Sequence, residues 1–366
     1  MKIASIESFT DAKARLGVVR VRTDDGAEGY GGMAHNNTDI SAAILHRQVA
    51  PLALGADPQD ADALSRQIIE ENYKFPGSYV CRALAGLDTA LWDLRGKVEG
   101  RSVSSLLGGR RRRVAVYGSS MRRDTTGEQE VERILAARQW GGFRAFKLKI
   151  GKRLGHDEDT WPGRGEQVIG AVRAAVGDDV PLLVDANSCY SPAKAIEVGR
   201  MLEQLGVCHF EEPCPYWELE QTAEVAAALE MPVAGGEQDC DLAQFRRMIA
   251  MRAVDIVQPD VCYVGGLSRA LRAAKLAAEA HLPVTPHSPG GDGSMIRVFT
   301  LHYLAAIPNA GPFMEYSIEP GGQKTDLYTP PLLARDGELE LPEGPGWGVT
   351  VNAEWLAKAQ RMVSEA

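Results

Sequence analysis

Three carboxylates stand at equal intervals in the second half of the sequence. Asp185 lies in PLLVDAN, Glu211 in HFEEP and Glu237 in PVAGGE, so that successive acids are 26 residues apart. Each follows a short apolar run typical of a strand and precedes a segment typical of a helix. This period places the three acids at one end of a parallel barrel, where the C-terminal ends of the strands converge. Carboxylates without a Cys and His cluster favour a hard cation, Mg²⁺ first and Mn²⁺ as a second choice.

A similar interval continues along the chain, and seven consecutive expected strands end in an ionisable group. The groups are Lys147 and Lys149, then Asp185, Glu211, Glu237, Asp260, His287 and Glu315. Lys147 and Lys149 are two residues apart and therefore share one face of their strand. Each can lower the pKa of the other and free an amine as a base, although two lysines that only neutralise the acids remain an alternative. Asp260 can orient His287 and raise its basicity.

Together these groups suit the removal of a proton next to a substrate carboxylate, with the cation stabilising the enediolate. Within Glu211-Glu212-Pro213 only one side chain can point inward on a strand, and the spacing favours Glu211 over Glu212. Polar side chains suited to a polyol, Arg123 and Tyr263 among them, surround the expected mouth of the barrel. The candidates for substrate binding are Asn187, Tyr190, Arg122, His35, Trp217 and Ser288. His35 either covers the mouth or belongs to an ordinary turn.

The elements that must position these residues fall into two groups. Residues 1–113 read as an α+β domain, with strands at 3–9, 17–22 and 28–31 and helices at 38–50, 61–71 and 80–98. Residues 114–317 alternate strand and helix, which predicts a parallel (β/α)8 barrel or a variant without its last helix. A doubly wound sheet is disfavoured because no Gly-rich phosphate turn follows the first strand. The segment 318–366, with a strand at 337–341, is expected to return to the N-terminal domain.

Composition restricts the partners. The chain has 366 residues, a formal net charge of −9 and a pI near 5.4. These values argue against nucleic acid or an anionic membrane as the main partner. The six cysteines are scattered without a CxxC pair, which indicates free thiols in a reducing compartment. Without a signal peptide or a span of about 20 apolar residues, the chain is expected to be cytoplasmic.

With these motifs together, the sequence resembles the mandelate racemase subgroup of the enolase superfamily. The resemblance rests on KLK at 147–149, DAN at 185–187, EEP at 211–213, GE at 236–237, QPD at 258–260 and PHS at 286–288. It implies a (β/α)7β TIM-like barrel with an α+β capping domain built from both ends of the chain. It also implies Mg²⁺ on the three acids, and a homo-oligomer, either a dimer or an octamer.

The resemblance further implies a role for each remaining group. Lys149 would be the base on one face and the His287–Asp260 pair would act on the other. Lys147 would bind the substrate carboxylate, and Glu315 would hydrogen-bond the enolate oxygen. One departure concerns residues 9–16, where members usually carry an extended loop over the substrate. The specificity lid is therefore expected to be nearly absent.

The main functional hypothesis is dehydration of a sugar acid to a 2-keto-3-deoxy acid by a hydro-lyase of the enolase superfamily. Racemisation or epimerisation of an α-substituted carboxylate needs the same two groups on opposite faces of the substrate. Cycloisomerisation of a sugar lactone is a third use of the same site. Outside enzymology, a barrel that only binds a metabolite is the remaining alternative.

Overall fold

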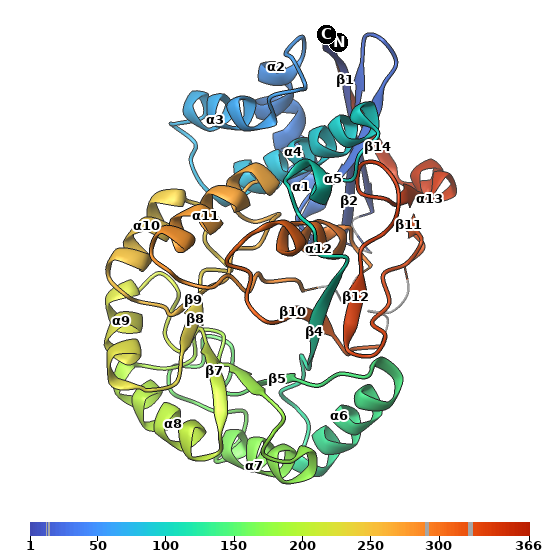
Figure 1. Cartoon of the computed structure of the whole chain (residues 1–366). Helices are drawn as coiled ribbons and strands as arrows, with labels where there is room; N and C mark the ends of the chain where they lie inside the picture. The colour runs from blue at the N-terminus through green and yellow to red at the C-terminus, as the bar shows by residue number, and fades with distance from the viewer. Residues whose placement is uncertain (12, 14, 290–292, 321–324) are drawn as a thin grey trace.

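The computed structural model describes residues 1–11, 13, 15–289, 293–320 and 325–366. An α+β cap lies above a barrel of alternating strands and helices (Figure 1). The cap sheet has the strand order β14-β1-β2-β3. Its strands are antiparallel and comprise β1 (Ile3–Asp11), β2 (Leu16–Thr23), β3 (Glu28–Gly32) and β14 (Gln360–Glu365). Both ends of the chain therefore build the cap, as predicted.

Helix α4 (Ser78–Glu99) packs directly on the cap sheet. A Cβ added at Gly31 would lie 2.4 Å from the backbone nitrogen of Ala90, so glycine there permits the close approach of strand and helix. The single helix expected over 38–50 is instead interrupted. It comprises α1 (Thr38–Ile44), a π-helical turn η1 (Leu45–Val49) and α2 (Ala50–Ala53).

The barrel strands follow one another in chain order and are parallel. They are β4 (Arg113–Ser119), β5 (Phe146–Lys149), β6 (Leu182–Asp185), β7 (Val207–Glu211), β8 (Val233–Gly235), β9 (Ile256–Val257) and β10 (Met314–Ser317). The seventh strand, expected over 283–287, is reduced to bridges from Val284 to Val257 and Ala310. Strand β10 pairs with β4, which closes the ring.

Seven helices of the described chain alternate with these strands. They are α6 (Gly127–Gly141), α7 (Arg164–Val176), α8 (Pro192–Gln204), α9 (Leu219–Ala228), α10 (Leu242–Ala250), α11 (Leu267–Glu279) and α12 (Ile296–Ala306). No described barrel helix follows β10, so the architecture is (β/α)7β, as predicted. Strand β4 begins at Arg113 and β10 ends at Ser317. The division of the chain into domains at these points stays a prediction.

The C-terminal segment does not run to the cap alone. Strand β12 (Glu338–Glu340), part of the segment expected to return to the N-terminal domain, pairs antiparallel with β4 at the start of the barrel. The segment then forms β11 (Tyr328–Thr329) with β13 (Thr350–Val351), followed by α13 (Ala353–Lys358), before β14 reaches the cap. The strand-like pattern of residues 337–341 could not indicate whether this strand pairs with the cap or with the barrel.

The cap packs on barrel helix α11 through two of its own helices, α4 and α3 (Ala61–Glu71). The indole nitrogen of Trp92 donates to the Ser268 hydroxyl over 3.0 Å. The Asp88 carboxylate accepts the backbone N–H of Ser268 over 3.1 Å, at the start of α11. Arg272 and Asp62 form an ion pair at 2.6 Å. Among the described residues, no helix is both long enough and apolar enough to cross a membrane.

A buried histidine also connects barrel and cap, and it gives a first prediction. Nδ1 of His302 on α12 accepts the backbone N–H of Ser104, which lies in α5 (Val103–Leu106), and Nε2 donates to the carbonyl of Trp347. Burial lowers the pKa of His302 to about 4. Its stabilising contribution is therefore complete above the unfolded pKa near 6.5 and is lost as the pH falls toward 4, a change of about 3 kcal/mol.

We expect the free energy of unfolding of His302→Gln to depend less on pH between 4 and 6.5. Glutamine can accept and donate hydrogen bonds at similar places, but it does not titrate. Urea unfolding between pH 4 and pH 8 measures the effect. An unchanged slope in the variant would show that other groups control the acid stability.

Candidate active site

The ends of three neighbouring strands bring the first groups together. Lys149 on β5 is in register with Asp185 on β6, which is in register with Glu211 on β7. Residues at one level of a parallel barrel point to a common interior. All three side chains are buried, and Glu237, just after β8, is buried beside them. The strand register therefore assembles the cluster.

Asp185, Glu211 and Glu237 form a group able to hold a cation. Each offers an oxygen, and these oxygens lie within 4.8 Å of one another. Oε2 of Glu237 has no hydrogen-bond partner among the described residues, although it is buried. A buried set of carboxylate oxygens, one of them without a donor, fits a hard divalent cation such as Mg²⁺. The three residues predicted as metal ligands are thus brought together; the identity of the ion stays a prediction.

Lys147 lies at the centre of the negative charge. Its ammonium donates to both oxygens of Glu211, over 2.9 and 2.8 Å, and lies 3.0 Å from Oε1 of Glu315. Burial lowers the pKa of Lys147, but the charges of Glu211 and Glu315 outweigh burial and raise the pKa well above its ordinary value. The acids therefore favour the charged form of Lys147, which suits it to hold a substrate carboxylate rather than to act as the base.

Lys149 occupies the outer position of the lysine pair. Its ammonium forms an ion pair with Oδ2 of Asp185. Its side chain is 8% exposed, whereas that of Lys147 is 1% exposed, so Lys149 is the lysine nearer the mouth. The two lysines, indistinguishable by type and face in the sequence, thus have different surroundings.

On the far side of the cluster, His287 pairs with Asp260. Nδ1 of His287 lies 2.7 Å from Oδ2 of Asp260, whose other oxygen accepts the backbone N–H groups of Cys262 and Tyr263. The carboxylate is thereby fixed and can orient the ring. Nε2 of His287 lies 3.6 Å from Glu237. Burial lowers the pKa of His287, but the Glu237 charge and the Asp260 hydrogen bond raise it to about 10.

Glu315 on β10 completes the ring of charges. Its two oxygens accept from the Ser119 hydroxyl over 2.8 Å and from the backbone N–H of Ser288 over 3.0 Å. Burial raises the pKa of Glu315, but the charges of Lys147 and His287 outweigh burial and hold the pKa below its usual value. Glu315 is therefore ionised and lies between the lysine side and the histidine side of the mouth.

Two polar residues of the site, His209 and Gln258, were not identified in the sequence, and a third, Glu212, was considered there but placed behind Glu211. Glu212 leaves the strand pattern with a φ of 43°, so its buried side chain turns back and accepts from Asn187 over 3.4 Å. Burial and the neighbouring acids raise the pKa of Glu212 well above its ordinary value. His209 lies 3.4 Å from Glu211, and Gln258 donates to Glu211 over 3.0 Å. Both precede an acid by two residues, a period-2 signal that could have revealed them.

Of the six candidates for substrate binding, Asn187 and Ser288 contact the cluster directly, and His35 approaches it through Tyr263. Asn187 donates to Asp185 over 3.1 Å, and Ser288 contacts Glu315 as described. His35 reaches the mouth from the cap, since its Nε2 lies 3.1 Å from the hydroxyl of Tyr263. The Tyr263 ring lies 5.7 Å from the His287 ring. The segment after β3 therefore approaches the histidine side, where the sequence left an ordinary turn open.

The other three candidates have different partners. Arg122 pairs with Asp124 at the surface over 2.6 Å, while its neighbour Arg123 donates to Asn187 over 2.5 Å. Trp217 is 51% exposed and packs edge-on against Tyr216. Of the two arginines that the sequence places in the polar surround, Arg123 is thus the one that reaches the cluster.

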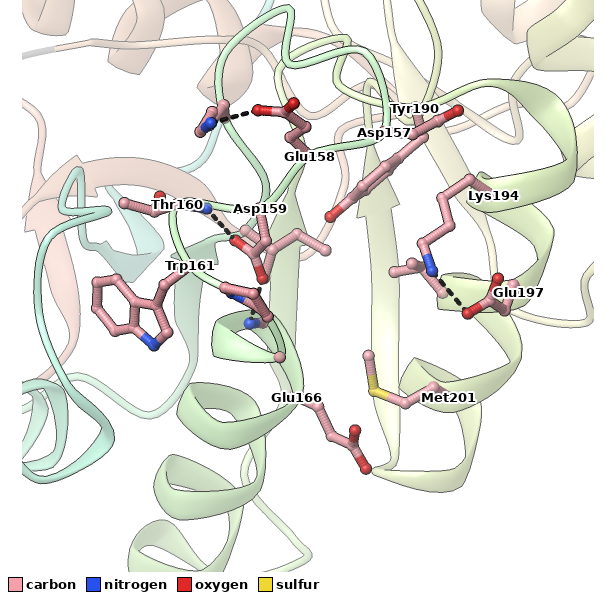
Figure 2. Close-up of a pocket in the computed structure, with 16 residues that line it drawn as sticks. Asp157, Glu158, Asp159, Thr160, Trp161, Glu166, Tyr190, Lys194, Glu197 and Met201 are labelled. Carbon is pink, nitrogen blue, oxygen red and sulfur yellow. Dashed lines mark hydrogen bonds and ion pairs between the residues drawn. The ribbon is translucent and has the colours of Figure 1, made fainter.

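Tyr190 lines a different cavity. This cavity measures about 650 Å³ and lies between the loop before α7 and helix α8. Figure 2 shows Tyr190 between the loop with Asp157 and Asp159 and the helix with Lys194 and Glu197. Lys194 and Glu197 pair at 2.7 Å. The cavity does not include any of the metal-site carboxylates among its lining residues.

Comparisons with known proteins agree with this geometry. Residues 3–108 match the family described as mandelate racemase/muconate lactonizing enzyme, N-terminal domain, and residues 129–355 match the enolase C-terminal domain-like family. The chain is 31% identical to an arabinonate dehydratase of Saccharolobus solfataricus, over 95% of this chain and 91% of that protein. It is 34% identical to a D-galactarolactone cycloisomerase of Agrobacterium fabrum, over 95% and 92%.

Solved structures extend the likeness to the whole molecule. A protein of Roseobacter denitrificans, provisionally named a racemase, is 50% identical with a TM-score of 0.96, and the match covers 100% of both chains. An L-talarate dehydratase of Polaromonas sp. JS666, complexed with Mg and L-glucarate, is 27% identical with a TM-score of 0.86, over 100% and 99%. The chain belongs to the mandelate racemase/muconate lactonizing enzyme family of the enolase superfamily.

Proposed function

We propose that the protein dehydrates a sugar acid to a 2-keto-3-deoxy acid with the help of Mg²⁺. The observation that carries the proposal is the order of groups around the mouth. Lys149 contacts Asp185 on β6, and His287 contacts Glu237 after β8, so the two flank the three carboxylates. A substrate carboxylate at this cluster would have a proton-transfer group on either side of its α-carbon.

Each side chain has a defined task in this proposal. The fixed positive charge of Lys147 binds one oxygen of the substrate carboxylate. Lys149, as the free amine, takes the α-proton, and the electron pair of that bond moves toward the carboxylate. Mg²⁺ on Asp185, Glu211 and Glu237 would supply positive charge to offset this development.

His287 then donates a proton from Nε2 to the β-hydroxyl group, which leaves as water. Asp260 holds the ring through Nδ1 during this transfer. The resulting enol takes a proton at C3 and becomes the keto acid. Glu315 lies beside Lys147 and is held there by its hydrogen bonds to Ser119 and Ser288. To hydrogen-bond the enolate oxygen, the role that the family resemblance implies, Glu315 would have to carry a proton.

A second candidate is racemisation or epimerisation, which the same placement of Lys149 and His287 supports. His287 would then deliver its proton to the α-carbon instead of the leaving hydroxyl. The likeness to the Roseobacter protein points in the same direction. Cycloisomerisation of a sugar lactone, which the name of the Agrobacterium relative suggests, is a further use of the same groups.

The test is incubation of the Mg²⁺-loaded protein in deuterated water with a panel of aldonic and aldaric acids. If the protein is a dehydratase, NMR should show a new 2-keto-3-deoxy acid. Treatment of this keto acid with semicarbazide should give a semicarbazone that is detected by its absorbance. Exchange at the α-carbon with inverted product and no loss of water would instead establish racemisation or epimerisation. No exchange with any member of the panel would contradict sugar-acid chemistry.

We also propose that the protein works in the cytoplasm as a homo-oligomer, either a dimer or an octamer. All six cysteines are free thiols in the structure, which suits a reducing compartment. Light scattering of the purified chain measures the assembly directly.

A further inference from the structure

Two cysteines meet where the cap touches the barrel. Cys81 lies in the first turn of α4 in the cap, and Cys240 lies in the loop between β8 and α10 of the barrel. The Cys81 thiol donates to the carbonyl oxygen of Cys240 over 3.5 Å. The two thiols are close enough to shift each other's pKa in opposite directions. They are 159 residues apart in the chain, so the fold alone brings them together.

The two sulfurs differ in acidity and access. Cys240 is partly exposed, whereas Cys81 is buried. The Cys81 hydrogen bond and the charges of Arg269 and Arg82 outweigh burial and lower the pKa of Cys240 to about 7. Arg269 also donates to the Cys240 carbonyl over 2.8 Å, which keeps its charge at the loop. At neutral pH Cys240 is therefore substantially a thiolate, the reactive form of the side chain.

Other cysteines of the described chain have opposite surroundings. Burial raises the pKa of Cys189 and Cys208, and it raises that of Cys214 to about 12. Cys208 is the informative one, since the residue is exposed but its thiol donates to the carbonyl of Leu182 over 3.3 Å. At Cys208 burial of the sulfur outweighs the nearby charge of Arg173 and raises the pKa, so reactivity should not follow exposure of the residue here.

We propose that Cys240 and Cys81 form an oxidative modification site, a dithiol that hydroperoxides convert to a disulfide between the cap and the barrel. Cys240 is the attacking sulfur and Cys81 is the resolving one. The site is independent of the proposed reaction, because neither thiol belongs to the cluster of lysines and carboxylates.

The chemistry balances with hydrogen peroxide as the oxidant. The Cys240 thiolate attacks one peroxide oxygen, an S–O bond forms, the O–O bond breaks, and hydroxide leaves and is protonated to water. Sulfur loses two electrons and becomes a sulfenic acid. The Cys81 sulfur, having lost its proton, attacks this sulfur, the S–S bond forms, and the S–O bond breaks with release of a second water.

The position of the Cys81–Cys240 disulfide would restrict movement at the mouth of the barrel. Cys240 follows Glu237 by three residues, and Cys81 precedes Arg82, whose guanidinium lies 3.7 Å from the centre of the Tyr263 ring. A disulfide would tie the loop after one of the metal-site carboxylates to the cap helix that carries Arg82. The cap could then not shift on the barrel at this edge.

The experiment is peroxide titration of the reduced full-length protein, followed by peptide mass mapping and thiol counting. We expect the first product to be an intramolecular Cys81–Cys240 disulfide, with two thiols lost per chain. In Cys81→Ser the resolving thiol is missing, so dimedone should trap a sulfenic acid on Cys240. In the reduced protein at pH 7, iodoacetamide should label Cys240 at least about tenfold faster than Cys208.

Two controls keep the outcome decisive. Cys208→Ser should leave the first product unchanged, and Cys240→Ser should abolish it while leaving the thermal transition of the reduced protein in place. Earlier oxidation of Cys208 or Cys189, or only disulfides between chains, would overturn the proposal. So would a Cys81→Ser variant whose Cys240 is not trapped by dimedone.

Discussion

Replacing Lys149 with alanine is expected to lower the rate of α-proton exchange by about 10³-fold or more. Lys149 is the lysine nearer the mouth and flanks the carboxylates, whereas Lys147 is held as a cation by Glu211 and Glu315. Lys147 therefore cannot replace Lys149 as the base that removes the α-proton. Deuterium incorporation into a substrate identified by the panel, followed by NMR with Mg²⁺ present, measures the loss.

Two comparisons sharpen this experiment. Lys152→Ala removes an exposed lysine that pairs with Glu158, and it should retain the exchange rate. His287→Asn should retain exchange of the proton that Lys149 removes but lose the release of water. If Lys149→Ala exchanged at the original rate and His287→Asn did not exchange, the base would lie on the histidine side.

The second large effect concerns Lys147 and the cation together. Lys147→Met keeps the volume of the side chain but leaves the buried carboxylates of Glu211 and Glu315 without their ammonium partner. Loss of one partner from a buried ion pair typically costs about 3–5 kcal/mol. We expect a loss of this size in the presence of EDTA and a smaller one with Mg²⁺, which would return positive charge to the cluster.

Urea unfolding with EDTA or with Mg²⁺ measures both values. Lys194→Met serves as the matched control, because Lys194 forms an exposed pair with Glu197 that contributes less than about 1 kcal/mol. Equal losses in the two variants would mean that the charge cluster contributes no stability of its own. An identical loss of Lys147→Met stability with and without Mg²⁺ would argue against a cation on the three acids.

The parts of the molecule that follow a regular period were predictable from the sequence. Strand register alone brings Lys149, Asp185 and Glu211 to one level, and the βα interval adds Glu237 and His287. The hydrophobic pattern also predicted a parallel barrel, either (β/α)8 or a variant without its last helix, because buried parallel strands and amphipathic helices have distinct periods. The family resemblance selected the (β/α)7β form.

The predictions that depend on loop conformation were less secure. Arg122 and Arg123 have the same chemistry, and only the turn after β4 decides that Arg123 contacts Asn187. Glu212 reads as a strand residue, but a φ of 43° turns its side chain inward. Tyr190 follows the same loop away from the mouth to the cavity beside α8. Backbone torsions outside regular elements depend on tertiary contacts, which a single sequence does not contain.

The pairing of β14 with β1 sets an order on assembly during translation. Strand β14 follows the whole barrel in the chain, so a ribosome delivers every barrel strand before the cap sheet can gain its fourth strand. Until then, one edge of β1 presents unpaired backbone groups, which are a hazard for association with other chains. The cover of the mouth is thus completed last, and a nascent chain with a finished barrel still carries an open sheet edge.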